Sequence, residues 1–339
     1  MKKIIKFIFV LILLVFFISG CVAQQSREYT SLEAIAKYLS ETDGGSNENN
    51  PLSLRLSIDL QNMLADESGW KKLLKIINTQ GKYVALDLSN CKMSGTEFNP
   101  DVKFEDGKKF IISIILPDVT ESIVEANIEL DRRGRVSSPS TFQYFSKLEL
   151  SIPSKVTFIG YPIFTYCSNI ASISFKKGSQ LEGIDWSAFS DSKLVTITIP
   201  ASVTYIDQGA FSGCKNLINV IFEHGSLLNK VGVQAFAFCD NLETITIPSS
   251  VSFIEDMAFE DCSNLKSITI FAVDPPALGH GAFSTFQVLS GSIYTGSVSG
   301  VYNKTPALEA IYVPSESVSA YKSAENWSDY AEIIKPIIK

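Results

Sequence analysis

The chain has 339 residues, of which 45% are hydrophobic, and its formal net charge at pH 7 is −7. This apolar content is sufficient for a large hydrophobic core. The acidic balance argues against nucleic acid and against anionic lipid as binding partners.

The first twenty residues have the composition of an export signal. Three lysines lie within the first six residues, and the run from Ile4 to Phe17 is almost entirely apolar. This pattern predicts a secretory signal peptide over residues 1–20 rather than a transmembrane span. The small residues before Cys21 resemble a bacterial lipobox, which implies cleavage before Cys21 and a diacylglyceryl thioether on its sulfur. The alternative is an uncleaved anchor helix.

Both alternatives predict an exported chain that is tied to a membrane, at the outer membrane or the cell surface. Processing before Cys21 removes three lysines and no acids, so the net charge of the mature chain changes from −7 to −10. Residues 21–30 are polar and predict a short linker between the lipid and the fold.

Residues 31–91 are predicted to form an N-terminal cap. The strict alternation of residues 52–60 and the apolar run over residues 83–91 predict two strands, the second of which resembles a degenerate first coil of the repeat. We expect this segment to shield the first strand edge of the structure that follows.

Two helices are expected in the same cap. Residues 31–39 have helical spacing, and Ser31 is placed to cap the helix at its N-terminus. Residues 69–80 form an amphipathic helical pattern that ends at Gly81.

Residues 92–307 are predicted to form a solenoid, because one pattern recurs along them. Its clearest copies open at Leu194, Leu217, Leu242 and Leu265, so the successive steps are 23, 25 and 23 residues. Self-similarity at this period is typical of a stacked repeat. One such unit buries its apolar face only against its neighbours in the stack.

Each repeat predicts a short strand, a bend and a compact turn. In Leu-x-x-Ile-x-Ile the two isoleucines share one face of a strand, and Pro or Gly-Ser then ends the pairing. The spacing of Ala210, Phe211 and Cys214 fits a single helical turn. We expect Phe211 to stack with its counterparts Phe236 and Phe259 as a buried spine. The predicted fold class is therefore a repeat solenoid of parallel short strands with short helical turns, mainly β with an α/β N-terminal cap.

Six cysteines in an exported chain suggest disulfides at first sight. Four of them occupy the same slot of the repeat, however: Cys167, Cys214, Cys239 and Cys262. Residues in one slot stack with parallel side-chain vectors, a geometry that does not favour bridging. The sequence therefore predicts buried free thiols at these four positions and leaves Cys91 unassigned.

The chain ends with a further repeat and a closing segment. Residues 308–339 are predicted to be a terminal coil and C-terminal cap. Ser328 is placed to cap a last short helix that reaches Ile334 and covers the end of the stack.

The repeat resembles the BspA-type leucine-rich repeat. The string Leu-x-x-Ile-x-Ile-Pro-x-x-Val-x-x-Ile-x-x-x-Ala-Phe-x-x-Cys-x-Asn carries the resemblance over residues 145–335, and more loosely over 83–123. The run from Ile311 to Trp327 is similar to the terminal unit of that family. Departures from the pattern are Lys147, where a leucine should open the coil, and residues 191–193, which lack the Cys-x-Asn ending.

The resemblance implies a leucine-rich-repeat-like stack and a function. The family comprises surface proteins of host-associated bacteria and some protozoa, generally taken to bind proteins of the host or of neighbouring cells. It therefore implies a cell-surface lipoprotein that acts as a protein-binding scaffold, either an adhesin or a surface antigen. The alternative is a structural envelope lipoprotein without a specific ligand.

No pattern of catalytic, cofactor-binding or metal-binding residues stands out. The two histidines, His224 and His280, lie in different coils and have no second ligand type at metal spacing. Phosphate-loop, dinucleotide-binding, zincin and nucleophile-elbow strings do not occur. We therefore predict no enzymatic activity and no cofactor, with an exported hydrolase built on dispersed carboxylates as the alternative.

A first candidate contact surface is the outward side of the repeat strands. Thr196 and Thr198 of one strand and Thr244 and Thr246 of another stack with serines in a Ser/Thr-rich face. This face is either a flat protein-binding surface or a ladder of residues that suit exposed strands.

A second candidate contact surface is the segment 284–305. It is rich in Ser, Gly and Thr and carries Phe286, Tyr294 and Tyr302, and it predicts an irregular loop. Tyrosine supplies contact area at low entropy cost, so this loop is either a recognition segment or an excursion without a ligand.

Overall fold

The computed structural model describes residues 27–100, 106–123, 148–159, 169–292 and 297–338, together with residues 142, 144, 145, 163–165 and 167. The predicted signal peptide over residues 1–20 and Cys21 lie outside the described residues. Within the part described, no helix has the length and apolarity needed to cross a bilayer.

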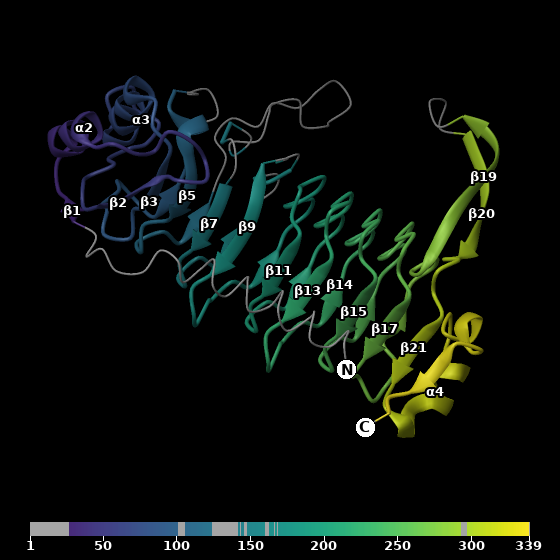
Figure 1. Cartoon of the computed structure of the whole chain (residues 1–339). Coiled ribbons are helices and arrows are strands. Elements are labelled where there is room, and N and C mark those ends of the chain that lie inside the picture. Colours follow the sequence, from purple (N-terminus) through teal and green to yellow (C-terminus); the bar gives the residue numbers. More distant parts are fainter. Residues whose placement is uncertain are drawn as a thin grey trace, which may run out of the picture.

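The chain is a repeat solenoid in which one row of parallel strands runs along the whole stack, as Figure 1 shows. We call it the long-strand row. It begins with a six-stranded sheet made of β1 (Glu28–Tyr29), β2 (Leu52–Leu56), β3 (Val84–Asp87), β5 (Ile111–Ile115), β7 (Leu148–Ile152) and β9 (Ile170–Phe175). It continues through the pair β11 (Thr196–Ile199) and β13 (Asn219–Phe222), and then through β15 (Thr244–Ile247), β17 (Ser267–Ile270), β21 (Ala310–Val313) and β22 (Ile334–Pro336).

A second row of two-residue strands forms another side of the solenoid, and we call it the short-strand row. Its eight strands pair in parallel in this order: β4 (Glu97–Phe98), β6 (Ser122–Ile123), β8 (Phe158–Ile159), β10 (Gly183–Ile184), β12 (Tyr205–Ile206), β14 (Lys230–Val231), β16 (Phe253–Ile254) and β18 (Ala277–Leu278). The second residue of each strand points inward, because Ile206, Val231 and Ile254 are completely buried. The apolar residue that recurs after the bend of each repeat therefore belongs to a second, shorter strand.

The third side of the solenoid consists of turns, and here the prediction of a helical turn was wrong. The backbone N–H groups of Ser212 and Cys214 donate to the carbonyls of Gly209 and Phe211, which are bonds between residues three apart. Phe211 N–H donates instead to the next coil, at 2.8 Å from the Ala235 carbonyl oxygen. Alternate N–H groups thus bond between coils, which an α-helix does not allow.

Left-handed residues on both sides of the Ala-Phe pair produce this geometry. The residue before the alanine has a positive φ in five successive coils, at Ser187, Gly209, Gln234, Met257 and Gly281. The position four residues further on repeats the conformation in four of them, at Asp191, Gly213, Phe238 and Asp261. A left-handed residue interrupts a right-handed helix, so the segment folds as a chain of turns.

The interior of the stack contains the predicted phenylalanine spine. Neighbouring ring centroids are 5.1–5.5 Å apart and each ring is completely buried, from Phe164 through Phe189, Phe211, Phe236 and Phe259 to Phe283. Offset stacking at this separation is favourable for aromatic pairs. The predicted stacking of Phe211, Phe236 and Phe259 is confirmed.

The predicted buried free thiols are also confirmed, and the structure shows what they do. The Cys239 thiol donates to the Phe211 carbonyl of the preceding coil at 3.3 Å, and the Cys262 thiol donates to the Phe236 carbonyl at 3.0 Å. Burial raises the pKa of Cys214 to about 12, so this thiol stays protonated and acts as a donor. Ser192 fills the same slot where the sequence lacks the cysteine, and it is buried beside Cys214.

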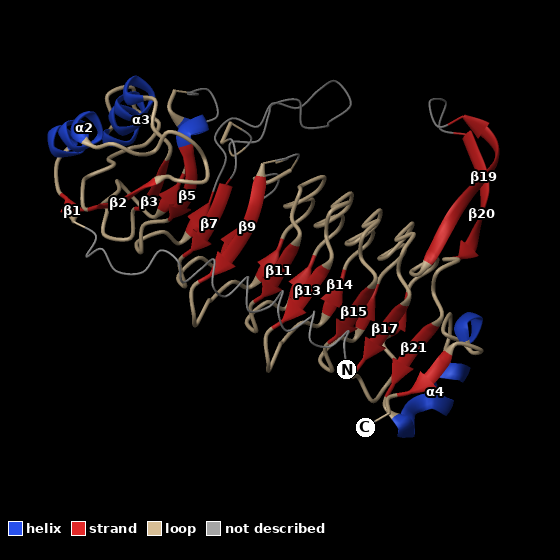
Figure 2. Ribbon diagram, in the orientation of Figure 1, coloured by secondary structure: helices blue, strands red, loops and turns tan. Residues whose placement is uncertain are grey.

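Two helices lie at the N-terminal end of the stack (Figure 2). Helix α2 (Leu32–Glu41) begins at Ser31, whose hydroxyl accepts a bond from the Ala34 N–H, and α3 (Gly69–Gln80) ends at Gly81 in a left-handed conformation. Both helices and their caps agree with the sequence expectation. The Trp70 ring on α3 is fully buried and meets Phe98 edge-on at 5.9 Å.

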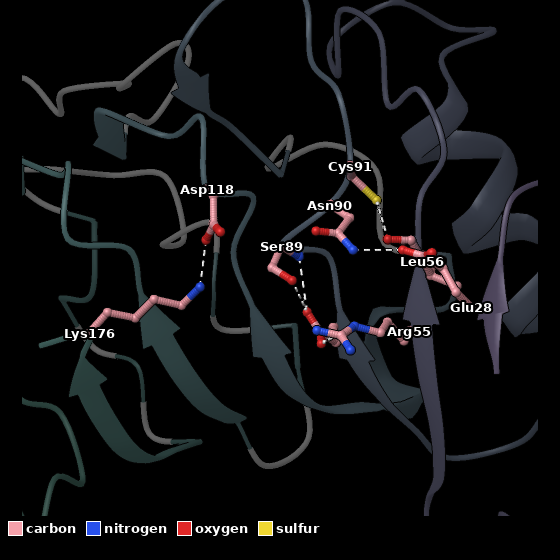
Figure 3. A network of polar contacts seen from close by, with 9 residues as sticks. Glu28, Arg55, Leu56, Ser89, Asn90, Cys91, Asp118 and Lys176 are labelled. Atoms are coloured by element: carbon pink, nitrogen blue, oxygen red, sulfur yellow. Dashed lines mark hydrogen bonds and ion pairs between the residues drawn. The ribbon is translucent and has the colours of Figure 1, made fainter. Parts of the chain in front are cut away.

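Polar contacts join successive strands at this end, as Figure 3 shows. Arg55 pairs with Asp87 of the neighbouring strand at 3.2 Å, and Asn90 donates to Glu28 at 2.6 Å. The Cys91 thiol donates to the Leu56 carbonyl of the preceding strand at 3.5 Å, so Cys91 has the same role as the cysteines of the regular coils.

The C-terminal end is covered by α4 (Val318–Ser323) and two 3-10 turns, η2 (Ser315–Ser317) and η3 (Ser328–Tyr330). The expected helix from Ser328 to Ile334 is wrong, because only η3 forms and Ile334 begins β22, which pairs with β21. The Tyr321 hydroxyl and the Trp327 ring N–H donate to the carbonyls of Ala272 and Pro276 at 2.9 and 2.7 Å. Side chains of this segment therefore satisfy backbone groups of the last regular coil.

The segment 284–305 is not the irregular loop that we expected. It forms an antiparallel hairpin of β19 (Ser284–Ser292) and β20 (Ser297–Lys304), which projects from the last coils in Figure 1. The segment contains Thr, Val, Phe and Tyr, which suit strands, and pairing satisfies its backbone groups internally. Its many serines and glycines hid this strand pattern in the sequence.

Candidate functional site

The Ser/Thr-rich face lies on the outward side of the long-strand row. Thr196 and Thr198 are opposite Asn219 and Ile221 in the parallel register of β11 and β13, and Thr244 and Thr246 are opposite Ser267 and Thr269. Thr198, Thr244 and Thr246 are exposed and Thr196 is partly buried. The face carries small hydroxyl groups and one large apolar side chain, Ile221, which is 50% exposed.

The hairpin brings together two of the three aromatic residues that we singled out in segment 284–305. Phe286 and Tyr302 are direct register partners in β19 and β20. Tyr294 lies outside the described residues. The hairpin therefore places Phe286 and Tyr302 at one level of a two-stranded ribbon.

A third surface, which the sequence analysis did not identify, lies on the outward side of the short-strand row. The parallel register aligns the first residue of five successive strands in one column: Gly183, Tyr205, Lys230, Phe253 and Ala277. We call this column the short-strand face. It carries two aromatic rings, whereas the threonine strands β11 and β15 carry none.

Tyr205 lies flat across the neighbouring coil. A Cβ atom placed on Gly183 would stand 2.1 Å from Cζ of the Tyr205 ring, so the ring rests on the glycine backbone and only glycine permits this approach. Tyr205 itself is half-buried. The hydroxyl end of the ring, with Cζ, Cε1 and Cε2, is the part that lies over Gly183.

Neighbouring carboxylates make the surroundings of Tyr205 electronegative. Burial raises the pKa of the Tyr205 hydroxyl first, and the negative charges of Asp185, Asp207 and Glu182 raise it further. Among the residues that the structure describes, no basic side chain forms an ion pair with any of these three acids. Lys230, one strand further on, is 3.1 Å from Glu255 and has its charge offset there.

A shallow groove of about 270 Å³ lies at the other end of the short-strand face. Its walls are Phe253, Val233, Ala277 and Leu278, with Glu255 and Asp256 at the polar margin. The Phe253 side chain is 49% exposed. The short-strand face therefore has an acidic aromatic platform at Tyr205 and an apolar groove at Phe253.

An alignment of the repeats in the sequence already places the five residues of this face at one position. The residue before the second buried aliphatic is Gly183, Tyr205, Lys230, Phe253 or Ala277 in successive coils. These residues have no type in common, so the repeat pattern gave them no weight. Only the register of β10, β12, β14, β16 and β18 shows that they form one column.

The described residues offer no group of side chains that could bind a metal ion, and burial raises the pKa of two of their cysteines. Nowhere among them do three or more His, Cys, Asp or Glu side chains gather where they could bind a metal ion. Burial raises the pKa of Cys91 to about 11 as well as that of Cys214, and a protonated buried thiol is inert.

The chain was compared with curated proteins, solved structures and models of protein families. A search of curated proteins found no match. The chain is similar to the pneumococcal vaccine antigen PcpA, with 24% identity and a TM-score of 0.39 over 68% of this chain, and it spans 56% of the length of that antigen.

Two further solved structures are similar to the chain. A leucine rich cell surface protein from Faecalibacterium prausnitzii A2-165 is 18% identical, with a TM-score of 0.28 over 72% of this chain and 80% of that one. A leucine-rich repeat protein from Bacteroides ovatus ATCC 8483 is 14% identical, with a TM-score of 0.27 over 85% of this chain and 84% of that one.

The family comparison is specific to the regular coils. The model described as BspA type leucine rich repeat region matches six copies over residues 137–266. This span contains β7, β9, β11, β13 and β15 of the long-strand row. The central part of the solenoid is therefore a BspA-type leucine-rich repeat region, as the sequence pattern predicted.

Proposed function

We propose that the protein is an exported lipoprotein displayed at the cell surface, where its repeat scaffold binds a host or neighbouring-cell protein without catalysing a reaction on it. The observation that carries this proposal is the run of six BspA-type repeats in a solenoid whose outward strand positions are exposed. Stacked repeats provide extended surfaces that suit protein recognition. In this proposal residues 92–307 are the binding unit, and residues 31–91 and 308–339 cover its two ends.

The proposed anchor is a lipid on Cys21. It is supported by the basic and apolar signal over residues 1–20, the small residues before Cys21 and the short linker over residues 21–30. A Cys21→Ser variant should accumulate unprocessed and move out of the detergent phase. The mass of the mature N-terminus measures this directly, and unchanged mass and partitioning in the variant would contradict lipidation.

The proposed contact regions are the Ser/Thr-rich face and the hairpin. Threonine variants on the face (Thr196, Thr198, Thr244 and Thr246 to Ala) are compared with deletion of residues 286–303, which removes Phe286, Tyr294 and Tyr302. Each variant is first matched to the parent by thermal unfolding. The affinity for a captured partner then assigns the contact to one region, because the two sets of residues do not overlap.

The experiment that tests the function is capture of host matrix proteins and proteins of co-resident bacteria on the immobilised mature chain. A supporting result is a purified partner that binds saturably and labels intact cells only when the protein is present. A chain that reaches the surface but captures no saturable partner would favour the alternative, a structural envelope lipoprotein. Hydrolysis of glycosidic, peptide or ester substrates by the purified chain would contradict the non-enzymatic part of the proposal.

A further inference from the structure

We propose that the short-strand face binds an extended peptide segment that carries a lysine or arginine and, three residues away, an apolar side chain. This inference rests on the proposed function, because it specifies the chemistry of the protein partner and the surface that receives it. It differs from the contact regions above, which lie on the long-strand row and on the hairpin.

The anchors for such a segment are present on the short-strand face, and the threonine strands of the long-strand row have none. Residues that dominate binding energy are enriched in large aromatic side chains and depleted in Ser and Thr. On the short-strand face Tyr205 is half-buried and Phe253 is 49% exposed, and the Ser/Thr-rich face has no aromatic side chain on its threonine strands. Trp186 is 45% exposed in the turn that follows β10, which adds a third aromatic residue near the same end.

The charges around Tyr205 select a cationic side chain. Glu182, Asp185 and Asp207 all act on the Tyr205 hydroxyl, and they form no ion pair within the described ranges. An ammonium or guanidinium group placed over the exposed side of the Tyr205 ring gains a cation–π contact, and charge-assisted hydrogen bonds to carboxylates are the stronger kind. An anionic segment would be repelled by the same three acids.

The distance between the two anchors fixes the form of the ligand. Tyr205 pairs with Lys230, which pairs with Phe253, so the anchors are separated by two strand spacings, or about 9.5 Å. A polyproline II helix rises about 9 Å in one turn of three residues. A segment in this conformation that runs along the stack therefore presents residues three apart to Tyr205 and to the groove beside Phe253.

Lys230 lies between the two anchors and would oppose a cationic ligand if its charge were unpaired. Its ammonium group is 3.1 Å from the Glu255 carboxylate, which offsets that charge. Removal of the lysine should leave Glu255 available to the ligand. Lys230→Gln is therefore a variant that should strengthen binding, in contrast to most surface substitutions.

The probe is the acetylated peptide Gly-Pro-Arg-Pro-Pro-Leu-Pro-Gly, with a matched peptide in which Glu replaces Arg. Trp186 reports binding by fluorescence, because the other two tryptophans, Trp70 and Trp327, are fully buried. We expect the arginine peptide to bind and the glutamate peptide not to bind. Affinity should fall at least about tenfold between about 20 mM and about 500 mM salt, because ions screen exposed charges.

Three variants of the mature chain and one control complete the test. Tyr205→Ala and Phe253→Ala should each weaken binding by about tenfold, Lys230→Gln should strengthen it, and Thr246→Ala on the long-strand row should leave it unchanged. Thermal unfolding of every variant is measured alongside. Equal binding of the two peptides, or binding that none of the short-strand variants alters, would overturn the inference. If an alanine variant fails to fold, the affinity of Lys230→Gln for the arginine peptide decides the test.

The same variants separate this inference from the proposed function. A protein partner that binds wild type, Tyr205→Ala and Phe253→Ala equally would leave the proposed function standing and sink the inference. A chain that binds the arginine peptide through Tyr205 and Phe253 but captures no partner would support the inference while the proposed function fails.

Discussion

The central coils over residues 170–283 and the N-terminal part over residues 27–123 share one core but hold it together differently. In the central coils the inward-facing positions of the repeat are filled by residues of one kind stacked on each other, as in the phenylalanine spine with centroids near 5.1 Å. In the N-terminal part the contacts are individual, such as Trp70 against Phe98 and Arg55 against Asp87.

This difference affects how each part responds to damage. A solenoid coil touches only its neighbours, so its stability is close to a sum of unit and interface terms. The N-terminal part instead contains helices α2 and α3, which pack on each other and whose buried side chains belong to the same hydrophobic core as the strands. We expect damage to remain near its origin in the central coils and to spread through the whole unit at the N-terminal end.

The largest expected effect comes from opening the spine. Phe236→Ala removes a fully buried ring that stacks on Phe211 and Phe259, and loss of a large core side chain costs about 3–5 kcal/mol. Amide hydrogen exchange should rise mainly in the coils of Phe211, Phe236 and Phe259. The free energy of unfolding and the exchange map together measure the effect.

Trp70→Ala is the matched variant at the other end. It should cost a similar amount, but exchange should rise across residues 27–123 while the coils around Phe236 keep their protection. Uniform loss of protection along the whole chain in either variant would contradict the comparison between the two parts.

The next effect in size concerns a buried acid of the central coils. Glu260 is 5% exposed and accepts a bond from the Gln234 amide at 2.9 Å, and burial raises its pKa above the usual value for a glutamate. The folded chain therefore binds the proton more tightly than the unfolded chain does. This contribution to stability is present at low pH and is lost as pH rises from about 4.5 through the folded pKa.

Glu260→Gln should remove the loss of stability with rising pH, because glutamine does not ionise. Its amide keeps an oxygen that accepts a hydrogen bond from Gln234. Each unit by which the pKa is raised corresponds to about 1.4 kcal/mol. The variant should therefore gain stability over the parent progressively between about pH 4 and pH 7. Denaturant unfolding across this range gives the difference, and a difference that does not change with pH would argue against a buried charge at Glu260.

The third effect tests what the cysteine slot requires. The Cys239 thiol donates to the Phe211 carbonyl of the preceding coil. Cys239→Val keeps the apolar bulk and loses the donor, which should cost about 1 kcal/mol. Cys239→Ser keeps a donor, as Ser192 does in the native chain, and should stay closer to the parent; a valine variant more stable than the serine variant would show that the slot selects bulk alone.

The regular features of the central coils could be predicted from sequence because they recur. Phe211, Phe236 and Phe259 were expected to stack, and the same periodicity gave the strands of the long-strand row. The helix Gly69–Gln80 was predictable for a different reason, since its apolar face and the glycine at its end follow helix rules directly.

The errors have physical causes that the repeat pattern does not express. Ala210 and Cys214 have helical spacing, yet left-handed residues beside them fold the segment into successive turns. The sequence does not reveal this conformation at Gln234 and Phe238, because residues other than glycine rarely adopt it. The short-strand face was missed because Tyr205 and Phe253 share a column with a glycine, a lysine and an alanine. Register, rather than residue type, brings them together.

The smallest expected effect concerns the left-handed residue that precedes the alanine in each central coil. Met257 occupies this position in one coil and Gly209 occupies it in another. Both residues have a positive φ, 57° and 62° respectively. A side chain in this conformation costs about 1–2 kcal/mol, which substitution by glycine removes. Glycine also increases the entropy of the unfolded chain, which offsets part of this stabilisation. Met257→Gly should therefore stabilise the chain by about 0.5–1 kcal/mol.

Gly209→Ala is the reverse substitution at the same slot. A Cβ there would lie 3.3 Å from the Ser187 hydroxyl oxygen, a distance that leaves backbone strain as the main cost. It should destabilise the chain by about 1 kcal/mol, and thermal unfolding should place the two variants on opposite sides of the parent. If both lowered the melting temperature, the packing of the Met257 side chain would outweigh the strain of its backbone, and the slots would tolerate left-handed residues through contacts between coils.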